Sequence, residues 1–244
     1  MKSIRTQIIV VFLAMIVFLV GSLGFVGCFL NYQTADATLK LSLTEAADIA
    51  AHQVSPEIAS IQQMAVEAGC EAGLANPDAP LQRKQQIIAQ KVERYGYESG
   101  NIVNLNGTGL LDGASYADQA FFQAALTGMP FLSDPVLENS GKTIRYYVSA
   151  PLWKDGVPGT EIVGVVYFCP QGDFLAKLVT DIGIGETGYA YMLNKNGTNV
   201  ADTSPEVISI ENSIEDAKTD DTLQACAEIE QKMIAGESGF GKYT

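Results

Sequence analysis

The stretch TIRYYVSAPLWKDGVPGTEIVGVVYF, residues 143–168, carries the clearest fold signal in the chain. Two runs rich in β-branched and aromatic residues, 143–150 and 162–168, flank a turn at Lys154-Asp155-Gly156. Such runs bounded by Gly, Pro and Asp are typical of strands, and glycine accepts the positive φ that tight turns need. We therefore expect two neighbouring antiparallel strands.

The residues before this hairpin predict helices around a sheet. A third strand is expected at residues 101–105, followed by a turn at Gly107, and helices are expected over 81–95 and 118–126. Helices and antiparallel strands in this order predict an α+β fold whose sheet packs one face against helices.

A long amphipathic pattern precedes them. Apolar residues recur every three or four positions from Leu39 to Ala68, which predicts one long stalk helix over residues 31–75 that Asn76-Pro77-Asp78 ends. This stripe of small and aliphatic residues also suggests a homodimer contact.

Residues 8–30 form an uncharged, strongly apolar run, long enough to cross a hydrocarbon core of about 30 Å as a helix. Lys2 and Arg5 precede the run and Asp36 follows it, so residues 1–7 are expected in the cytoplasm and the bulk of the chain outside the plasma membrane. A cleaved signal peptide and a lipoprotein anchored at Cys28 are the alternatives, but no small-residue cleavage site follows the run.

Composition limits the partners. A net charge of −13 makes binding to a nucleic acid unfavourable. Cys70, Cys169 and Cys226 are isolated, with no C-x-x-C pair or neighbouring histidine, so neither a metal site nor a cofactor is expected, and a disulfide requires that the fold bring two of them together.

An internal repeat indicates two modules. Asn104, Asn106, Gly107, Thr108 and Asp112 recur as Asn194, Asn196, Gly197, Thr198 and Asp202. Two unrelated hairpins that both use Asn-Gly turns are the alternative explanation. We expect a membrane-distal module at 76–180 and the start of a membrane-proximal module at 181–244, truncated after a helix near 222–234 and the beginning of a strand at Tyr243.

Several segments occur in an order and spacing that together are moderately specific for one known family. They are the start at residues 1–6 before the membrane run, the stalk, residues 115–128, Ser133-Asp134-Pro135, Ser149-Ala150-Pro151, Gly164-Val165-Val166 and residues 185–191. Together they resemble the double-Cache sensor domains of bacterial methyl-accepting chemotaxis receptors and related sensor kinases. The resemblance implies two PAS-like modules, a small ligand in the distal one, and a continuation beyond Thr244 into a second membrane helix and a cytoplasmic signalling region.

Family members that bind amino acids use a base and an aromatic residue on the short helix, a Tyr-x-Asp segment, and an Asp at the end of the last strand. The matching positions here are Gln119 and Phe121, Val136 and Glu138, and Cys169. Without a base at 119 or an acid at 169, a zwitterion would leave its charges poorly paired. The small-molecule ligand is therefore expected not to be a common amino acid.

The residues expected around the ligand pocket are mostly aromatic or neutral polar. The candidate ligand-binding residues are Tyr116, Asp118, Gln119, Phe121, Phe122, Glu138, Tyr146, Ser149, Tyr167 and Cys169, with Tyr147 and Trp153 in the same wider set. Each aromatic residue has the alternative of being plain core. Arg145 faces either the pocket or water, and Asp118 either touches ligand or caps the short helix.

Catalysis is not expected. His52, the only histidine, falls on the stalk, and Gly183-x-Gly185-x-x-Gly188 precedes a strand rather than a helix, the reverse of a dinucleotide-binding loop. The sequence favours the sensing region of a chemoreceptor. A sensor of a histidine kinase or diguanylate cyclase, and an adhesive surface protein with a closed distal module, are the alternatives.

Overall fold

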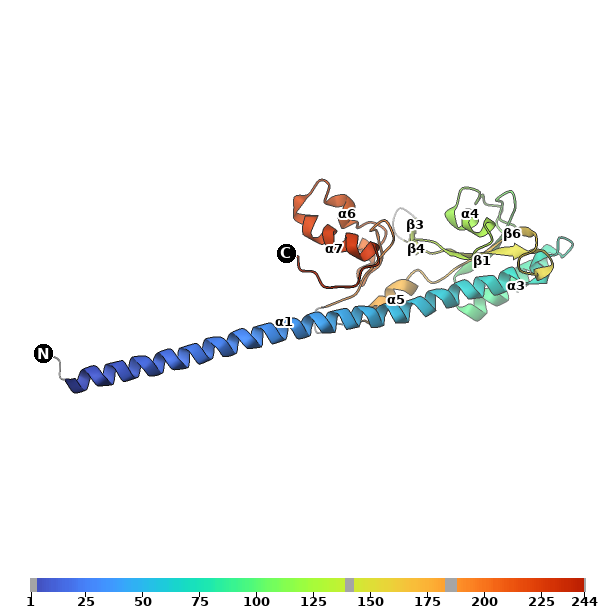
Figure 1. The fold of residues 1–244 in the computed structure, drawn as a ribbon. Coiled ribbons are helices and arrows are strands. Elements are labelled where there is room, and N and C mark those ends of the chain that lie inside the picture. Colours follow the sequence, from blue (N-terminus) through green and yellow to red (C-terminus); the bar gives the residue numbers. More distant parts are fainter. Residues whose placement is uncertain (1–3, 139–142, 183–187, 244) are drawn as a thin grey trace. The chain divides into compact units, whose positions relative to one another are not determined.

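A computed structural model of the chain describes residues 4–138, 143–182 and 188–243 (Figure 1). It contains two compact units, Met1–Ala46 and Ala47–Thr244. The glycine pattern at residues 183–188 lies largely outside the described residues.

The first unit is the N-terminal portion of helix α1 (Ile4–Gly69). Its apolar side chains are exposed, as Phe18 at 79% shows. The helix contains a stretch long and apolar enough to cross a membrane, beginning at Phe12. The expected helix over residues 8–30 is therefore present, and α1 continues through most of the predicted stalk.

The second unit is built on a four-stranded antiparallel sheet with the order β1-β6-β5-β2. The strands are β1 (Ser99–Asn104), β6 (Ile162–Cys169), β5 (Val148–Trp153) and β2 (Phe131–Leu132). The hairpin expected from residues 143–168 is confirmed, with Ser149 opposite Tyr167 across β5 and β6 and a short turn, η1 (Lys154–Gly156), between them.

The first strand of that hairpin is shorter than the sequence suggested. Residues 143–150 divide into β4 (Thr143–Arg145), which pairs with β3 (Val136–Glu138), and β5. Between them the Tyr147 amide donates to the Ser133 hydroxyl at 2.9 Å. The Ser133 hydroxyl oxygen there replaces the backbone carbonyl that would accept this hydrogen bond in a regular sheet. The chain stops pairing with β3 at this point and begins to pair with β2 and β6.

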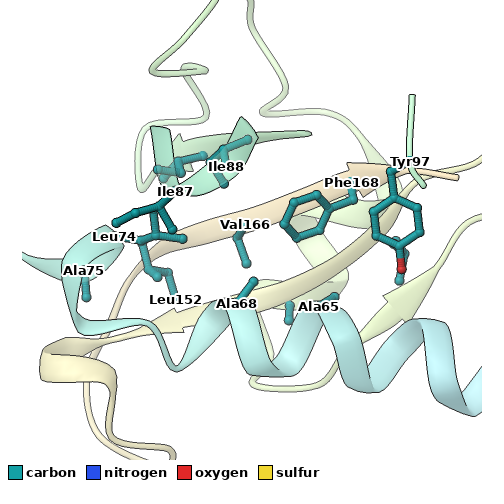
Figure 2. Close-up of a cluster of buried hydrophobic side chains, with 13 residues drawn as sticks. Ala65, Ala68, Leu74, Ala75, Ile87, Ile88, Tyr97, Leu152, Val166 and Phe168 are labelled. Atoms are coloured by element: carbon teal, nitrogen blue, oxygen red, sulfur yellow. The ribbon is translucent and has the colours of Figure 1, made fainter. Parts of the chain in front are cut away.

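One face of the sheet is covered by the end of α1, by α2 (Ala72–Ala75) and by α3 (Leu81–Tyr95) (Figure 2). Ala65 and Ala68 pack against Val166 and Phe168 in this core. Small residues are needed because α1 lies close to β5: a Cβ added at Gly69 would lie 2.2 Å from the Pro151 carbonyl oxygen. The stalk expected over 31–75 therefore ends at Gly69, and α3 has the predicted bounds.

The other face carries α4 (Ala120–Leu126), whose Phe121 and Phe122 are buried against Val103 and Val165. The helix begins two residues later than the sequence suggested. Gln119 occupies the N-cap position and makes no side-chain capping bond. Asp118 lies outside the helix and is exposed, so it does not cap α4.

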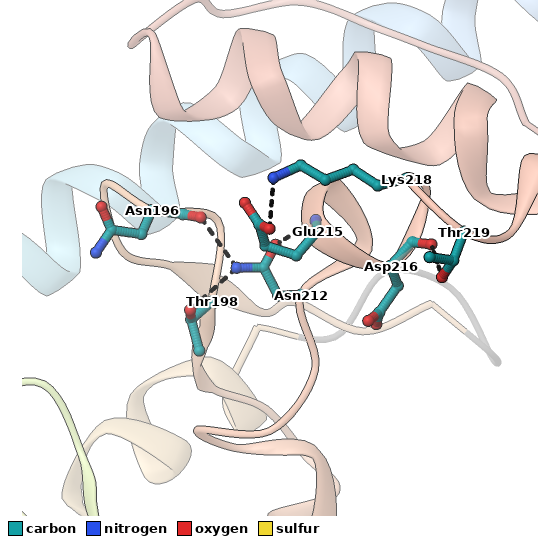
Figure 3. Close-up of polar contacts among 7 residues, drawn as sticks. All are labelled: Asn196, Thr198, Asn212, Glu215, Asp216, Lys218 and Thr219. Atoms are coloured by element: carbon teal, nitrogen blue, oxygen red, sulfur yellow. Dashed lines mark hydrogen bonds and ion pairs between the residues drawn. The ribbon is translucent and has the colours of Figure 1, made fainter.

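The C-terminal region, residues 188–243, follows α5 (Phe174–Thr180). Its elements are β7 (Met192–Leu193), β8 (Asn199–Ala201), η2 (Pro205–Val207), α6 (Ser213–Asp216), η3 (Asp221–Leu223) and α7 (Gln224–Ile234). Asn212 links α6 to the turn between β7 and β8. It caps α6 by accepting from the Glu215 amide, and it donates to the Asn196 carbonyl and the Thr198 hydroxyl (Figure 3). Tyr243 lies in no strand.

The two Asn-Gly turns of the internal repeat make matching hydrogen bonds. In the first copy the Gly107 amide donates to the Asn104 carbonyl at 2.9 Å, and the Thr108 amide to Asn104 Oδ1 at 3.0 Å. In the second copy Gly197 and Thr198 repeat both bonds to Asn194, each at 3.0 Å. Both glycines have positive φ, 84° and 82°. The two turns are the same structure.

Candidate functional site

The candidate site lies between α4 and the sheet, on a group of packed rings. This aromatic cluster consists of Tyr116, Phe121, Tyr147 and Tyr167. The Phe121 and Tyr147 rings stack with centroids 4.7 Å apart, and the Phe121 and Tyr167 centroids are 4.9 Å apart. Such faces suit apolar ligand groups.

Hydroxyl groups join the cluster to an acid. Tyr167 donates to the Tyr116 hydroxyl at 2.8 Å, and Tyr116 donates to Asp112 Oδ2 at 2.6 Å. Burial raises the pKa of Tyr167 well above its usual value. For Asp112, burial acts to raise the pKa, but hydrogen bonds from Tyr116 and from the Ala114 amide outweigh it and lower the pKa. Tyr167 is therefore a neutral donor and Asp112 a carboxylate.

A charged pair lies beside the rings. Tyr147 donates to Glu138 Oε1 at 2.8 Å, and Arg145 Nε lies 3.2 Å from Glu138 Oε2. Both charged side chains are about 30% exposed. The buried Arg145 Nε makes no hydrogen bond despite this ion pair, so one donor of the fork is left unused. The site therefore holds a base and an acid that a ligand can reach from solvent.

The structure brings together most of the sequence-derived candidates. Tyr116, Phe121 and Tyr167 belong to the cluster, while Phe122 and Cys169 are buried in the core around it. Ser149 is also buried and donates to the Phe121 carbonyl at 2.8 Å, which fixes α4 on the sheet. Glu138 joins the site through Tyr147.

Other candidates lie elsewhere. Asp118 and Gln119 are exposed ahead of α4. Tyr146, between β4 and β5, is fully buried outside the aromatic cluster, edge-on to Phe174, and donates to the Val200 carbonyl at 3.0 Å. Tyr147, its neighbour, faces the cluster instead, and the two-residue periodicity of extended chain was the signal for this division.

Arg145 turns toward the site by the same rule, since it lies two positions before Tyr147. The thiols take no part in cross-links: Cys28, Cys70, Cys169 and Cys226 are all free. Burial raises the pKa of the Cys169 thiol, which is therefore neutral. Among the described residues, no group of three or more His, Cys, Asp or Glu side chains is arranged to hold a metal ion.

The fold around this site is that of chemoreceptor ligand-binding domains. The ligand-binding domain of the Pseudomonas fluorescens chemoreceptor CtaA, solved with L-alanine, matches with a TM-score of 0.57 and 15% identity over 72% of this chain and 76% of that one. The sensory domain of the Campylobacter jejuni chemoreceptor Tlp3, solved with isoleucine, matches with a TM-score of 0.53 and 16% identity over 72% and 76%. No protein-family model and no curated protein sequence matches the chain.

The expectation that the ligand is not a common amino acid is wrong. Solved domains of this fold are bound to valine, isoleucine, serine and alanine. The expectation rested on Gln119 and Cys169, which carry no charge. It gave too little weight to Arg145 and Glu138, which supply a base and an acid beside the rings.

Proposed function

We propose that this chain is the extracytoplasmic sensing region of a transmembrane chemoreceptor of the double-Cache type, and that its distal module binds a small α-amino acid. The distal, PAS-like module would span residues 76–180, with the proximal one starting at 181. The observation that carries the proposal is the Arg145–Glu138 pair set against the aromatic cluster.

The chemistry of a zwitterion fits that pair. The guanidinium of Arg145 is permanently charged and about 30% exposed, and a carboxylate is its natural partner. Glu138, already held by Tyr147, would receive the ligand ammonium. A small aliphatic side chain would then lie on the partly exposed rings of Tyr116 and Tyr147. In the absence of ligand the two charges compensate each other.

The membrane part of the proposal rests on α1. Residues 8–30 would cross the membrane with residues 1–7 in the cytoplasm, and binding would be relayed through the helix. The receptor would act as a sensor and not as an enzyme, and would signal as a homodimer through the stalk. Single cysteines placed over residues 39–50 test the dimer in membranes. Disulfide cross-linking should respond to ligand, and the absence of cross-linking at every position tested contradicts the dimer.

Binding is tested with the full chain in lipid nanodiscs by calorimetric titration of L-isoleucine, L-valine, L-alanine and L-serine. At least one should bind saturably, and its D-enantiomer more weakly. Arg145→Gln should weaken binding at least about tenfold, because a hydrogen bond to a charged group is lost. Lys154→Gln is the matched control: Lys154 also pairs with a glutamate, Glu161, but on an exposed turn. No binding by any of the four, or equal binding by Arg145→Gln, contradicts the proposal.

A further inference from the structure

A cavity lies in the C-terminal region, among β7, β8, α6 and α7. It measures about 60 Å³. Its polar lining includes Tyr191, Asn199, Asp202, Ser213, Cys226 and Glu230. None of its lining residues belongs to the aromatic cluster or to the Arg145–Glu138 pair, so it is a separate site.

The cavity wall contains buried acceptors without donors. Glu230 is 4% exposed, and its Oε1 accepts from the Tyr191 hydroxyl at 3.2 Å, whereas Oε2 makes no hydrogen bond. Asn199 is 3% exposed, and its amide donates to Asp202 Oδ2 at 3.1 Å, whereas its Oδ1 makes none. The bond to Asp202 fixes the orientation of this amide, because the flipped form would place two acceptors together.

Leaving acceptors buried without partners is costly, so they point to a donor that enters the cavity. The lining residues include three acids, Asp202, Glu211 and Glu230, and no lysine or arginine. Burial raises the pKa of Glu230, while the hydroxyls of Ser213 and Tyr191 act in the opposite direction. A positive charge in the cavity would act against this rise and favour the carboxylate.

A metal ion does not fit. Among the described residues, the acids of this cavity included, no three or more His, Cys, Asp or Glu side chains are grouped so that they could hold one. An ammonium group does fit. It has three donors and no acceptor, matching Glu230 Oε2 and Asn199 Oδ1 with one donor left for a hydroxyl. The rings of Tyr189 and Tyr191 on the lining would add attraction for a cation.

We propose that this cavity is a second ligand site and that it binds a small primary ammonium compound. The site is independent of the amino-acid site in the distal module. Its occupant would be held by charge and hydrogen bonds in a cavity lined largely by polar atoms. The surplus of acidic residues over the whole chain, 28 against 15 basic ones, would favour the approach of a cation.

The first experiment titrates ethylammonium chloride into the full chain in nanodiscs by calorimetry, with ethanol and sodium chloride as comparisons. Ethylammonium should bind saturably, and neither comparison should. Glu230→Gln should weaken binding at least about tenfold, because it removes the charge but keeps an acceptor for Tyr191. Glu228→Gln, an exposed glutamate on the same helix, should leave binding unchanged.

The second experiment fills the cavity without altering its charge. Cys226→Met places extra atoms in the cavity, whereas Ala225→Met adds a methionine side chain at the exposed neighbouring position. Only Cys226→Met should abolish ethylammonium binding, with circular dichroism confirming that both variants are folded. The proposal is overturned by the absence of saturable binding to the wild type, by equal binding of ethanol or sodium, or by unchanged binding in both Glu230→Gln and Cys226→Met.

Discussion

The Tyr146 hydroxyl donates a hydrogen bond to the Val200 carbonyl at 3.0 Å, across 54 positions of sequence. The Tyr146 ring packs edge-on against Phe174 in a small core that also contains Leu175, Val179 and Ala201. The residue joins the sheet that carries the candidate site to the C-terminal region.

Tyr146→Phe tests this connection. The ring would keep its packing, but the part-buried Val200 carbonyl would lose its donor, so the free energy of unfolding should fall by about 1 kcal/mol. Amide hydrogen exchange near residues 199–201 should become faster, while amino-acid affinity should hardly change. Urea unfolding and hydrogen exchange measure both effects. An unchanged exchange rate at 199–201 would show that the bond does not hold the two regions together.

Gly69→Ala tests the close approach of α1 to β5. The new Cβ would lie 2.2 Å from the Pro151 carbonyl oxygen, a backbone atom that cannot turn away. We expect a loss of about 1 to 3 kcal/mol in urea unfolding, as for other overpacked positions. Gly239→Ala is the matched control, because a Cβ there meets nothing within 4 Å. Equal stability of the two variants would contradict this packing.

Asn212→Ala removes a cap and a bridge at once. The α6 N-cap bond and the two bonds to the Asn196–Thr198 turn are lost together, so the cost should exceed the roughly 1 kcal/mol typical of a lost cap. Thr219→Ala, whose hydroxyl bonds only the nearby exposed Asp216 carbonyl, should change stability by less than about 0.5 kcal/mol. Thermal unfolding distinguishes the two variants.

Acid should weaken the hydroxyl chain at the candidate site. Because the pKa of Asp112 is lowered in the folded protein, its contribution to stability is complete above the unfolded pKa of about 3.9 and is lost as the pH falls through the folded value. Asp112→Asn should therefore be less stable than the wild type at pH 6, with the difference shrinking toward pH 3. A difference in urea unfolding that is the same at both pH values would rule out this linkage.

Much of the fold follows from local pattern. The α3 bounds were predictable from periodicity and from Gly96, which ends the helix with φ 68°. The repeat was readable because its asparagines bond their own turns. The break between β4 and β5 could not be predicted from the residues around it, because it depends on the Ser133 hydroxyl, which lies 14 positions earlier in the chain.

The candidate site was harder to predict for a similar reason. The aromatic residues could be listed, but the assignment of Tyr146 and Tyr147 to opposite sides depends on which side of the sheet α4 covers. The uncharged Gln119 and Cys169 decided the sequence-based expectation about the ligand, whereas Arg145 and Glu138 form an ion pair across β3 and β4. Pairing between strands is a tertiary property and leaves no mark within either strand alone.

The adjacency of Tyr146 and Tyr147 makes the length of this segment as important as its composition. Deletion of one of the two tyrosines would leave a single ring for two positions. Either the aromatic cluster or the bond to Val200 would then lose its tyrosine. A substitution can change either tyrosine separately, whereas a change in chain length disturbs the division between them, so proteins that share this fold and this tyrosine pair should have no insertions or deletions at this point.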